Sequence, residues 1–256
     1  MTNDEALNVM RENKICVVVP TYNNGGTITD VLSRITNIAE HVILVVDGST
    51  DGTLEKVRQL NLPQVEVVDY QPNRGKGHAL AVGFRRAMQL GYNYAVTIDS
   101  DGQHYPEDMP ALIAGLKECP GALIVGSRNL QEKNMPGGNT FANKFSNFWF
   151  KVQTGMSLPD TQTGYRIYPL RRLPSTRLLT SRYEAELLLL VLSAWKGIPL
   201  KPVPVRVLYQ PEGERVSHFR PVADFARISV LNTVLCILAV CYGWPRMLLT
   251  KLIRKI

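Results

Sequence analysis

Residues 94–104 read YAVTIDSDGQH, and this stretch decides the prediction of the fold. Its first five residues are mostly apolar and are followed at once by two acids, which predicts a buried strand that ends in a polar turn. A turn at the strand end brings Asp99 and Asp101 together, and hard carboxylate oxygens suit Mg²⁺ or Mn²⁺. Such sites usually share the cation with phosphate groups of a substrate. The sequence therefore predicts a divalent-cation site at this strand end.

Segments of strand and helix character alternate on both sides of this stretch. Short apolar runs predict further strands at 15–19, 41–46, 64–68 and 122–125. Helical spacing of apolar residues predicts helices at 27–39, 53–60, 77–90 and 110–117. Strands that alternate with helices indicate right-handed βαβ units, so we predict an α/β fold with a mostly parallel central sheet.

Polar or glycine-rich loops follow all five predicted strands. They read PTYNNGG (20–26), DGSTDGT (47–53), NRGKG (73–77), DSDGQH (99–104) and GSR (126–128). One such loop would be ordinary, because loops are generally rich in Gly, Asn and Asp. Five at the carboxyl edge of one sheet favour a binding cleft, since ligands of open α/β sheets bind there. Within it, His104 is either a metal ligand or a hydrogen-bonding loop residue.

Composition and length indicate a globular chain. It has 256 residues, of which 45% are hydrophobic and 20% charged, enough to bury a core without covalent staples. The four cysteines are scattered without a C-x-x-C pair, which argues against a disulfide scaffold and a zinc ribbon. The polar, acid-containing start MTNDEALNVMRENK is unlike a signal peptide, so we expect the catalytic body in the cytoplasm.

The net charge of +7 is unevenly distributed. Residues 196–256 hold ten basic and three acidic residues, which accounts for the whole excess, and residues 1–195 are neutral overall. The basic residues flank an apolar run instead of stacking aromatics, which favours an anionic membrane surface over nucleic acid.

The apolar run itself spans residues 228–244. As a helix it would be about 25 Å long, short of a bilayer core of roughly 30 Å, and Pro245 is expected to break it. Residues 246–256 then predict a basic amphipathic helix. We expect a monotopic or re-entrant membrane attachment, with a helical pair docked on the domain and a true span as the alternatives. The aromatic cluster FANKFSNFWF (141–150) predicts either a core helix or an interfacial one.

Taken together, in their order along the chain, the motifs indicate a particular protein family. The set VVVPTYNN, VVDGSTDGT, NRGKGHAL, DSDGQHYPED, GSR and DTQTGYRIY resembles family 2 glycosyltransferases of the glycosyltransferase-A, or nucleotide-diphospho-sugar transferase, fold. Its nearest branch is that of the dolichol-phosphate mannosyltransferase-like enzymes, which glycosylate polyprenyl phosphates. The resemblance spans residues 14 to 218. We therefore expect a catalytic domain at 1–221 and a helical membrane-attachment segment at 222–256.

The resemblance implies roles for individual residues. Those implied to bind the nucleotide sugar are Pro20, Thr21, Tyr22, Asp47, Lys76, Asp99, Ser100 and Gln103, with Asp99 and Asp101 holding the metal. Those implied to be catalytic are Asp101, Arg128 and Asp160, and those implied to bind the acceptor are Arg166, Arg215, Ser217 and Arg220. The chain departs from the family at Asn24, where Glu is frequent, and at Val46, where an acid is frequent. Because of these two departures, the resemblance does not indicate which nucleobase the donor carries.

Transfer from a nucleotide-diphosphate develops negative charge on the leaving group, which a metal and nearby cations stabilise. Arg74, Lys76 and Arg128 are the available cations. A phosphate acceptor is already ionised and needs no strong base. An alcohol acceptor needs a carboxylate, such as that of Asp160 or Glu184, to act as the base that deprotonates it. Glu184 and Glu186 either cap an apolar helix or contact an acceptor or sugar hydroxyl.

We therefore predict an inverting, metal-dependent hexosyltransferase that uses Mg²⁺ or Mn²⁺. Its partners are a GDP- or UDP-hexose donor, a lipid acceptor, most simply a polyprenyl phosphate, and the cytoplasmic face of the cell membrane, but no nucleic acid. A homo-oligomer stays open. The alternatives are transfer to a lipid hydroxyl and a non-catalytic nucleotide-sugar-binding membrane protein. A nucleotidyltransferase is disfavoured because the PTYNNGG loop has no Lys or Arg.

Overall fold

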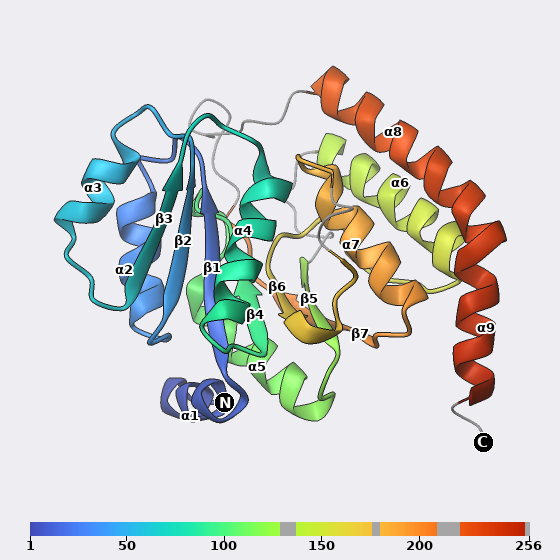
Figure 1. Ribbon diagram of the computed structural model, residues 1–256, viewed down its shortest axis with the longest axis horizontal. Coiled ribbons are helices and arrows are strands. Elements are labelled where there is room, and N and C mark those ends of the chain that lie inside the picture. The colour runs from blue at the N-terminus through green and yellow to red at the C-terminus, as the bar shows by residue number, and fades with distance from the viewer. Residues whose placement is uncertain (129–136, 176–179, 209–220, 254–256) are drawn as a thin grey trace.

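The computed structural model of the protein describes residues 1–128, 137–175, 180–208 and 221–253 (Figure 1). Its centre is a seven-stranded sheet in the order β3-β2-β1-β4-β6-β5-β7. The strands are β1 (Ile15–Thr21), β2 (Val42–Asp47), β3 (Val65–Tyr70), β4 (Tyr94–Thr97), β5 (Leu123–Arg128), β6 (Arg166–Pro169) and β7 (Leu200–Val205). β6 runs antiparallel to β4 and β5, and the other neighbouring strands are parallel. The expected mostly parallel α/β fold is confirmed.

Helices cover both faces of this sheet. They are α1 (Asn3–Asn13), α2 (Ile28–Thr36), α3 (Thr53–Gln59), α4 (Lys76–Gln89), α5 (Met109–Glu118), α6 (Gly137–Thr154), α7 (Glu184–Trp195), α8 (Pro221–Leu238) and α9 (Trp244–Ile253). One buried cluster joins the sheet to α1, α2 and α5, and a second joins it to α4, α7 and α8. The sheet is thus buried on both sides, which explains why its parallel strands read as continuous apolar runs.

One helix and two strands of the structure were not predicted from the sequence. α1 begins with a capping box between Thr2 and Glu5. β6 is a four-residue antiparallel insertion, and β7 contains two prolines, Pro202 and Pro204, yet pairs in parallel with β5. β7 lies at the edge of the sheet, where a missing backbone N–H is tolerated.

The expected helix break at Pro245 is wrong. A five-residue π-helical turn, Ala239–Gly243, joins α8 to α9, and Pro245 is the second residue of α9. A proline removes one backbone N–H and crowds the carbonyl four residues earlier. The wider π turn just before it accommodates this change without ending the helix.

One side of this long helix is docked on the domain, beside α6 and α7 (Figure 1). Asn232, Leu235 and Ala239 are buried there. Gln153 of α6 donates from Nε2 to Asn232 Oδ1 at 2.8 Å, and its backbone oxygen accepts from Trp195 Nε1 at 2.9 Å. Helix α8 therefore packs on α6 through a specific polar contact.

The other side of the helix is apolar and exposed. Its exposed large residues are Val230, Val234, Ile237, Leu238, Val240, Tyr242, Trp244, Leu248, Leu249 and Leu252. The 25 residues Ala226–Thr250 form a helix that is long and apolar enough to cross a membrane, and 22% of its most apolar window is buried. At 1.5 Å per residue it is about 37 Å long. The expectation of a segment too short to span rested on the break at Pro245 and no longer holds.

Candidate active site

Asp99 is the second residue after β4 and pairs with a lysine from another element. Lys76, the first residue of α4, places Nζ 2.7 Å from Asp99 Oδ1 and 2.8 Å from Glu186 Oε2 on α7. Burial opposes ionisation of Asp99, but the Lys76 ammonium outweighs it and lowers the pKa of the carboxyl. Lys76 is therefore held between two acids and is not a solvated loop residue.

Asp101 lies in the turn that follows, where its Oδ1 accepts a hydrogen bond of 3.0 Å from the backbone N–H of Gln103. Burial, together with the nearby Asp99 carboxylate, raises the pKa of Asp101 to about 6. The neighbouring carboxylates of Asp99 and Asp101 repel each other, and the single charge of Lys76 does not neutralise both. A divalent cation bound between them would relieve this repulsion. The residues present therefore fit Mg²⁺ or Mn²⁺.

Within the described part of the chain, no group of three His, Cys, Asp or Glu side chains could hold a metal ion. A cation at Asp99 and Asp101 would take its remaining ligands from substrate phosphates and water, as Mg²⁺ usually does. His104 is buried, its Nδ1 has no hydrogen-bond partner in the described part of the chain, and burial lowers its pKa to about 4.

Ser100 joins the β4 loop to the loop after β1. Its hydroxyl donates to the Pro20 oxygen at 3.0 Å and accepts from Asn24 Nδ2 at 2.7 Å. The Ser100 backbone oxygen accepts from the Thr27 hydroxyl. Ser100 and Pro20 are both buried, so this placement makes them braces between two site loops. Their direct contact with a nucleotide stays a prediction.

Thr21 and Tyr22 lead out of β1 at the same edge. Thr21 is buried and its hydroxyl finds no hydrogen-bond partner among the residues that the structure describes, whereas Tyr22 is half-buried. Their predicted contacts with the nucleobase remain predictions. Among the described residues, the Thr21 hydroxyl and Asn24 Oδ1 are the two buried side-chain oxygens of this loop that lack a hydrogen-bond partner.

Asp47, at the end of β2, holds the loop that starts α4. Its carboxylate accepts from the backbone N–H groups of Arg74 and Gly75, each at 2.7 Å, and from Asn73 Nδ2 at 3.0 Å. The residue is 2% exposed. These contacts assign Asp47 a structural task at the site, and contact with the base or ribose stays a prediction.

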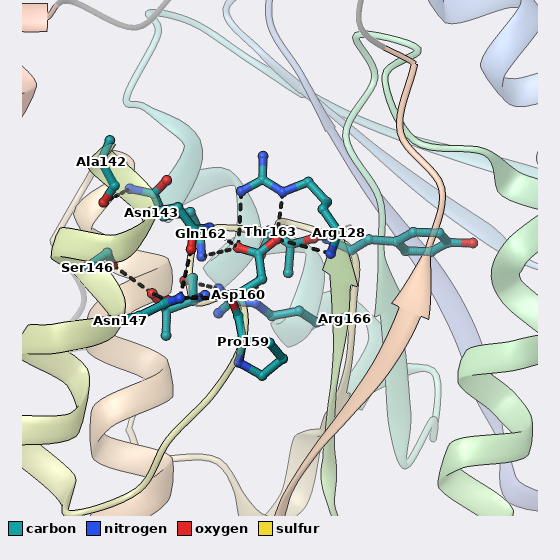
Figure 2. A network of polar contacts seen from close by, with 12 residues as sticks. Arg128, Ala142, Asn143, Ser146, Asn147, Pro159, Asp160, Gln162, Thr163 and Arg166 are labelled. Atoms are coloured by element: carbon teal, nitrogen blue, oxygen red, sulfur yellow. Dashed lines mark hydrogen bonds and ion pairs between the residues drawn. The ribbon is translucent and has the colours of Figure 1, made fainter. Parts of the chain in front are cut away.

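Arg128 and Asp160 form the second ionic pair of the site (Figure 2). The guanidinium at the end of β5 donates from Nε to Asp160 Oδ2 at 2.6 Å and from Nη2 to Oδ1 at 3.0 Å. Such bidentate pairs are strong and geometrically specific. The Arg128 side chain is 15% exposed and the Asp160 side chain is fully buried, so the arginine is the member that reaches the surface.

Asp160 accepts five hydrogen bonds from residues that the structure describes. Beyond the two from the guanidinium, they come from Asn143 Nδ2 of α6 at 2.7 Å, Gln162 N at 3.0 Å and Arg128 N at 3.3 Å. Burial opposes its ionisation, but the Arg128 contacts outweigh this and lower the pKa of Asp160. A carboxylate of low pKa whose oxygens are already occupied is a poor general base.

Arg166 is placed differently from the expectation. It is fully buried in β6, and its guanidinium donates to the backbone oxygens of Thr161, Thr163 and Glu186 and to the Tyr168 hydroxyl. It is thus committed to holding the 161–166 loop and the start of α7. This placement does not support direct contact between Arg166 and an acceptor.

The segment after β7 enters the site beside the acids. The Leu208 N–H donates to the Gln103 oxygen at 2.8 Å, and Val207 forms a bridge with His104. Arg215, Ser217 and Arg220 lie outside the described residues, so their acceptor contacts remain predictions.

Sequence reasoning missed two contributors to the site, Asn143 and Gly164, and left Glu186 between a helix cap and a contact with an acceptor or sugar hydroxyl. Asn143 holds Asp160, and Glu186 holds Lys76. Gly164 lies so close to the first pair that a Cβ there would be 2.6 Å from Asp99 Oδ2 and 2.9 Å from Lys76 Nζ. The glycine in DTQTGYRIY was the one available signal, because a close approach of side chains to backbone requires it.

The mixed sheet, with its acids after β4 and its cations at neighbouring strand ends, has the architecture of the glycosyltransferase-A, or nucleotide-diphospho-sugar transferase, fold. Solved structures with this architecture agree. The glucosyl-3-phosphoglycerate synthase of Mycobacterium tuberculosis, crystallised with Mn²⁺, UDP and phosphoglyceric acid, superposes with a TM-score of 0.68 at 20% identity, covering 94% of this chain and 82% of that one. A crystal of the same enzyme holds Mg²⁺ and UDP.

The chain belongs to glycosyl transferase family 2, whose sequence profile matches residues 16–168. It is 29% identical to the UDP-N-acetylglucosamine–dolichyl-phosphate N-acetylglucosaminyltransferase of Methanococcus voltae, covering 78% of this chain and 88% of that protein. It is 28% identical to the undecaprenyl-phosphate mannosyltransferase of Micrococcus luteus, covering 78% and 86%. The expected resemblance to the polyprenyl-phosphate branch is confirmed.

Proposed function

We propose that this glycosyltransferase transfers a hexose from a nucleotide-diphospho-sugar to a polyprenyl phosphate at the membrane surface, with inversion at the anomeric carbon. In this reaction, a phosphate oxygen of the lipid bonds to the anomeric carbon as the bond to the nucleoside diphosphate breaks. The relatives named above act on dolichyl and undecaprenyl phosphates and support this class of acceptor. They differ in the sugar they transfer, so the proposal extends to a hexose and no further.

The state of Asp160 carries the proposal. An alcohol acceptor would need a protein base, and Asp160 is buried with both oxygens bonded. Glu184, the other candidate base, is also buried. A lipid phosphate needs no base because its oxygen is already ionised, and it needs a cation, which Arg128 supplies from its fixed position on Asp160.

The donor would bind at the other ionic pair. Asp99 and Asp101 would hold a divalent cation, which when bound stabilises the negative charge that develops on the departing diphosphate. Mg²⁺ and Mn²⁺ complexes of the structural neighbour support this use of the fold. The loops after β1 and β2 would hold the nucleotide, with Tyr22 beside the base.

The exposed side of the helix Ala226–Thr250 would attach the protein to the cytoplasmic leaflet. Its apolar residues bury into the interface, and each basic residue near an anionic surface adds about 1 kcal/mol. Because α6 carries both Asn143, which contacts Asp160, and Gln153, which contacts α8, the Arg128 end of the site is tied to the membrane-facing helix.

The test is a transfer assay with purified protein, Mg²⁺ or Mn²⁺, a panel of labelled GDP- and UDP-sugars and a total lipid extract. We expect label from one donor to enter the organic phase, to stop with EDTA, and to be released by mild acid, as a glycosyl phosphate linkage is. Label in a lipid that survives mild acid would favour a glycolipid product, and no lipid label from any donor would contradict the proposal.

A further inference from the structure

The position of Lys76 is fixed from several sides. Besides Asp99 and Glu186, the Tyr183 ring lies with its centroid 5.9 Å from Nζ, and Gly164 leaves room for the ammonium where a Cβ would be 2.9 Å away. The side chain is 16% exposed. A lysine held in this way cannot follow a phosphate group as a flexible surface lysine does.

The backbone that carries the pair is equally constrained. Gly77 packs α4 directly on the start of α7, since a Cβ there would be 2.3 Å from the Thr180 oxygen and 2.5 Å from the Ala185 Cβ. The backbone oxygen of Glu186 accepts from Arg166 Nη1 at 2.9 Å. Lys76 and Glu186 are therefore brought together by two packed helix starts and not by a chance surface contact.

This arrangement sets the charge that a divalent cation meets. Lys76 occupies Asp99 Oδ1, so one half of the acid pair already has a counter-ion. The ammonium of Lys76 contacts two carboxylates, those of Asp99 and Glu186. Because Glu186 neutralises part of the ammonium charge, Asp99 keeps more of its own negative charge. Burial opposes the charged form, but Asp99 and Glu186 outweigh it and raise the pKa of Lys76, so the ammonium stays charged.

We propose that Lys76, positioned by Glu186, is a resident counter-ion of Asp99 that competes with the divalent cation, so that the cation binds well only together with the diphosphate of the donor. The inference rests on the metal-dependent donor site of the proposed function. It makes Glu186 a positioning residue, which acts on the cation through Lys76. The negative charge of the diphosphate adds the attraction for the divalent cation that Asp99, paired with Lys76, does not provide alone.

The experiment measures Mn²⁺ binding directly, by electron paramagnetic resonance of free Mn²⁺, with and without UDP or GDP. In the wild type, we expect the nucleotide to strengthen Mn²⁺ binding at least about tenfold. In Lys76→Met, Mn²⁺ alone should bind about tenfold more tightly, because a unit positive charge close to the dication is gone, and the gain from nucleotide should shrink. Lys201→Met is the matched control, since Lys201 also pairs with a carboxylate, Glu118, but at the start of β7, away from the acids.

Glu186→Gln tests the positioning role. Because Asp99 must then neutralise Lys76 alone, Mn²⁺ binding without nucleotide should weaken, and this effect should largely vanish when Lys76 is also Met. If Lys76 and Glu186 only stabilised the fold, each variant would have a lower unfolding temperature. Mn²⁺ binding would then not become tighter in Lys76→Met and weaker in Glu186→Gln. Unchanged or weaker Mn²⁺ binding in Lys76→Met overturns the inference alone. Failure of the wild type to bind Mn²⁺ even with both nucleotides overturns it together with the proposed metal site.

Discussion

The two ionic pairs of the site present opposite charges to the solvent. In the Asp99–Lys76 pair the cation is caged by a second acid, Glu186, and the acid is the more exposed partner, at 26% against 16%. In the Asp160–Arg128 pair the acid is fully buried and the cation is 15% exposed. The same kind of contact thus builds a negative end, suited to a metal and a diphosphate, and a positive end, suited to an anionic acceptor. What decides the chemistry is which partner the fold immobilises.

The largest effect should follow from breaking the negative end. Asp101→Asn removes an anionic oxygen from the acid pair while keeping its shape, so transfer should fall at least about a thousandfold with little change in folding. Transfer rate and thermal unfolding measure the two effects. Asp4→Asn, an exposed acid in α1, serves as the control. Near-normal transfer in the Asp101 variant would remove this acid from the site.

Breaking the positive end should cost stability as well as activity. Asp160→Asn leaves the Arg128 guanidinium without its ionic partner in a buried setting, which typically costs about 3 kcal/mol of unfolding free energy. Transfer should fall about a hundredfold, mainly through a higher KM for the acceptor, because the cation is no longer held. Chemical denaturation and acceptor titration check both parts. A lost kcat with unchanged stability and KM would instead mark Asp160 as a base.

A smaller effect should come from separating the positive end from the lipid. Ile237→Asp with Leu248→Asp places charge on the exposed side of the helix, where these residues are 61% and 63% exposed, so the fold should be spared. Partitioning onto anionic liposomes should fall at least about tenfold, because apolar burial is lost. Met88→Asp with Leu90→Asp, two exposed apolar positions at the end of α4, should leave it unchanged.

High salt sharpens this experiment. It should release the wild type from liposomes only in part, since screening acts on the basic residues and not on the apolar contact. Complete release by salt, or equal binding by the Ile237/Leu248 variant, would place the helix in an oligomer interface instead of the membrane.

The smallest effect on transfer should follow from Asp47→Asn, which acts on neither pair directly. Loss of one charged acceptor for the Arg74 and Gly75 N–H groups should lower the unfolding free energy by about 2 kcal/mol. Nucleotide affinity should fall only several-fold, through the loosened start of α4. Isothermal titration and denaturation measure both quantities. A large loss of affinity at unchanged stability would show that Asp47 contacts the nucleotide itself.

The strands and helices near the sheet centre could be predicted because burial on both faces makes them apolar without interruption. Residues 15–19 and 41–46 are such runs, and the structure extends them only to Thr21 and Asp47. β6 and β7 could not be predicted in this way. β6 is four residues long and follows a polar loop, and the prolines of β7 are tolerated only because it is an edge strand.

The acids of the site could also be predicted, but their tasks could not. That Asp99 and Asp101 follow a buried strand is visible in the sequence, whereas Lys76, Asp160 and Arg166 each have a partner on another element, which the local sequence does not indicate. Pro245 shows the same limit in the backbone. Its effect depends on the π turn before it, which local sequence rules do not anticipate.

The most direct test of the account compares two acceptors that differ only in the phosphate. Undecaprenyl phosphate and undecaprenol are presented in the same detergent with the active donor and Mn²⁺, to the wild type and to Arg128→Gln. The account predicts labelled product from the phosphate alone, and a loss of at least about a hundredfold in Arg128→Gln through the acceptor. Equal or faster transfer to undecaprenol would contradict it, because the site would then have to supply a base that Asp160, bound on both oxygens, does not provide.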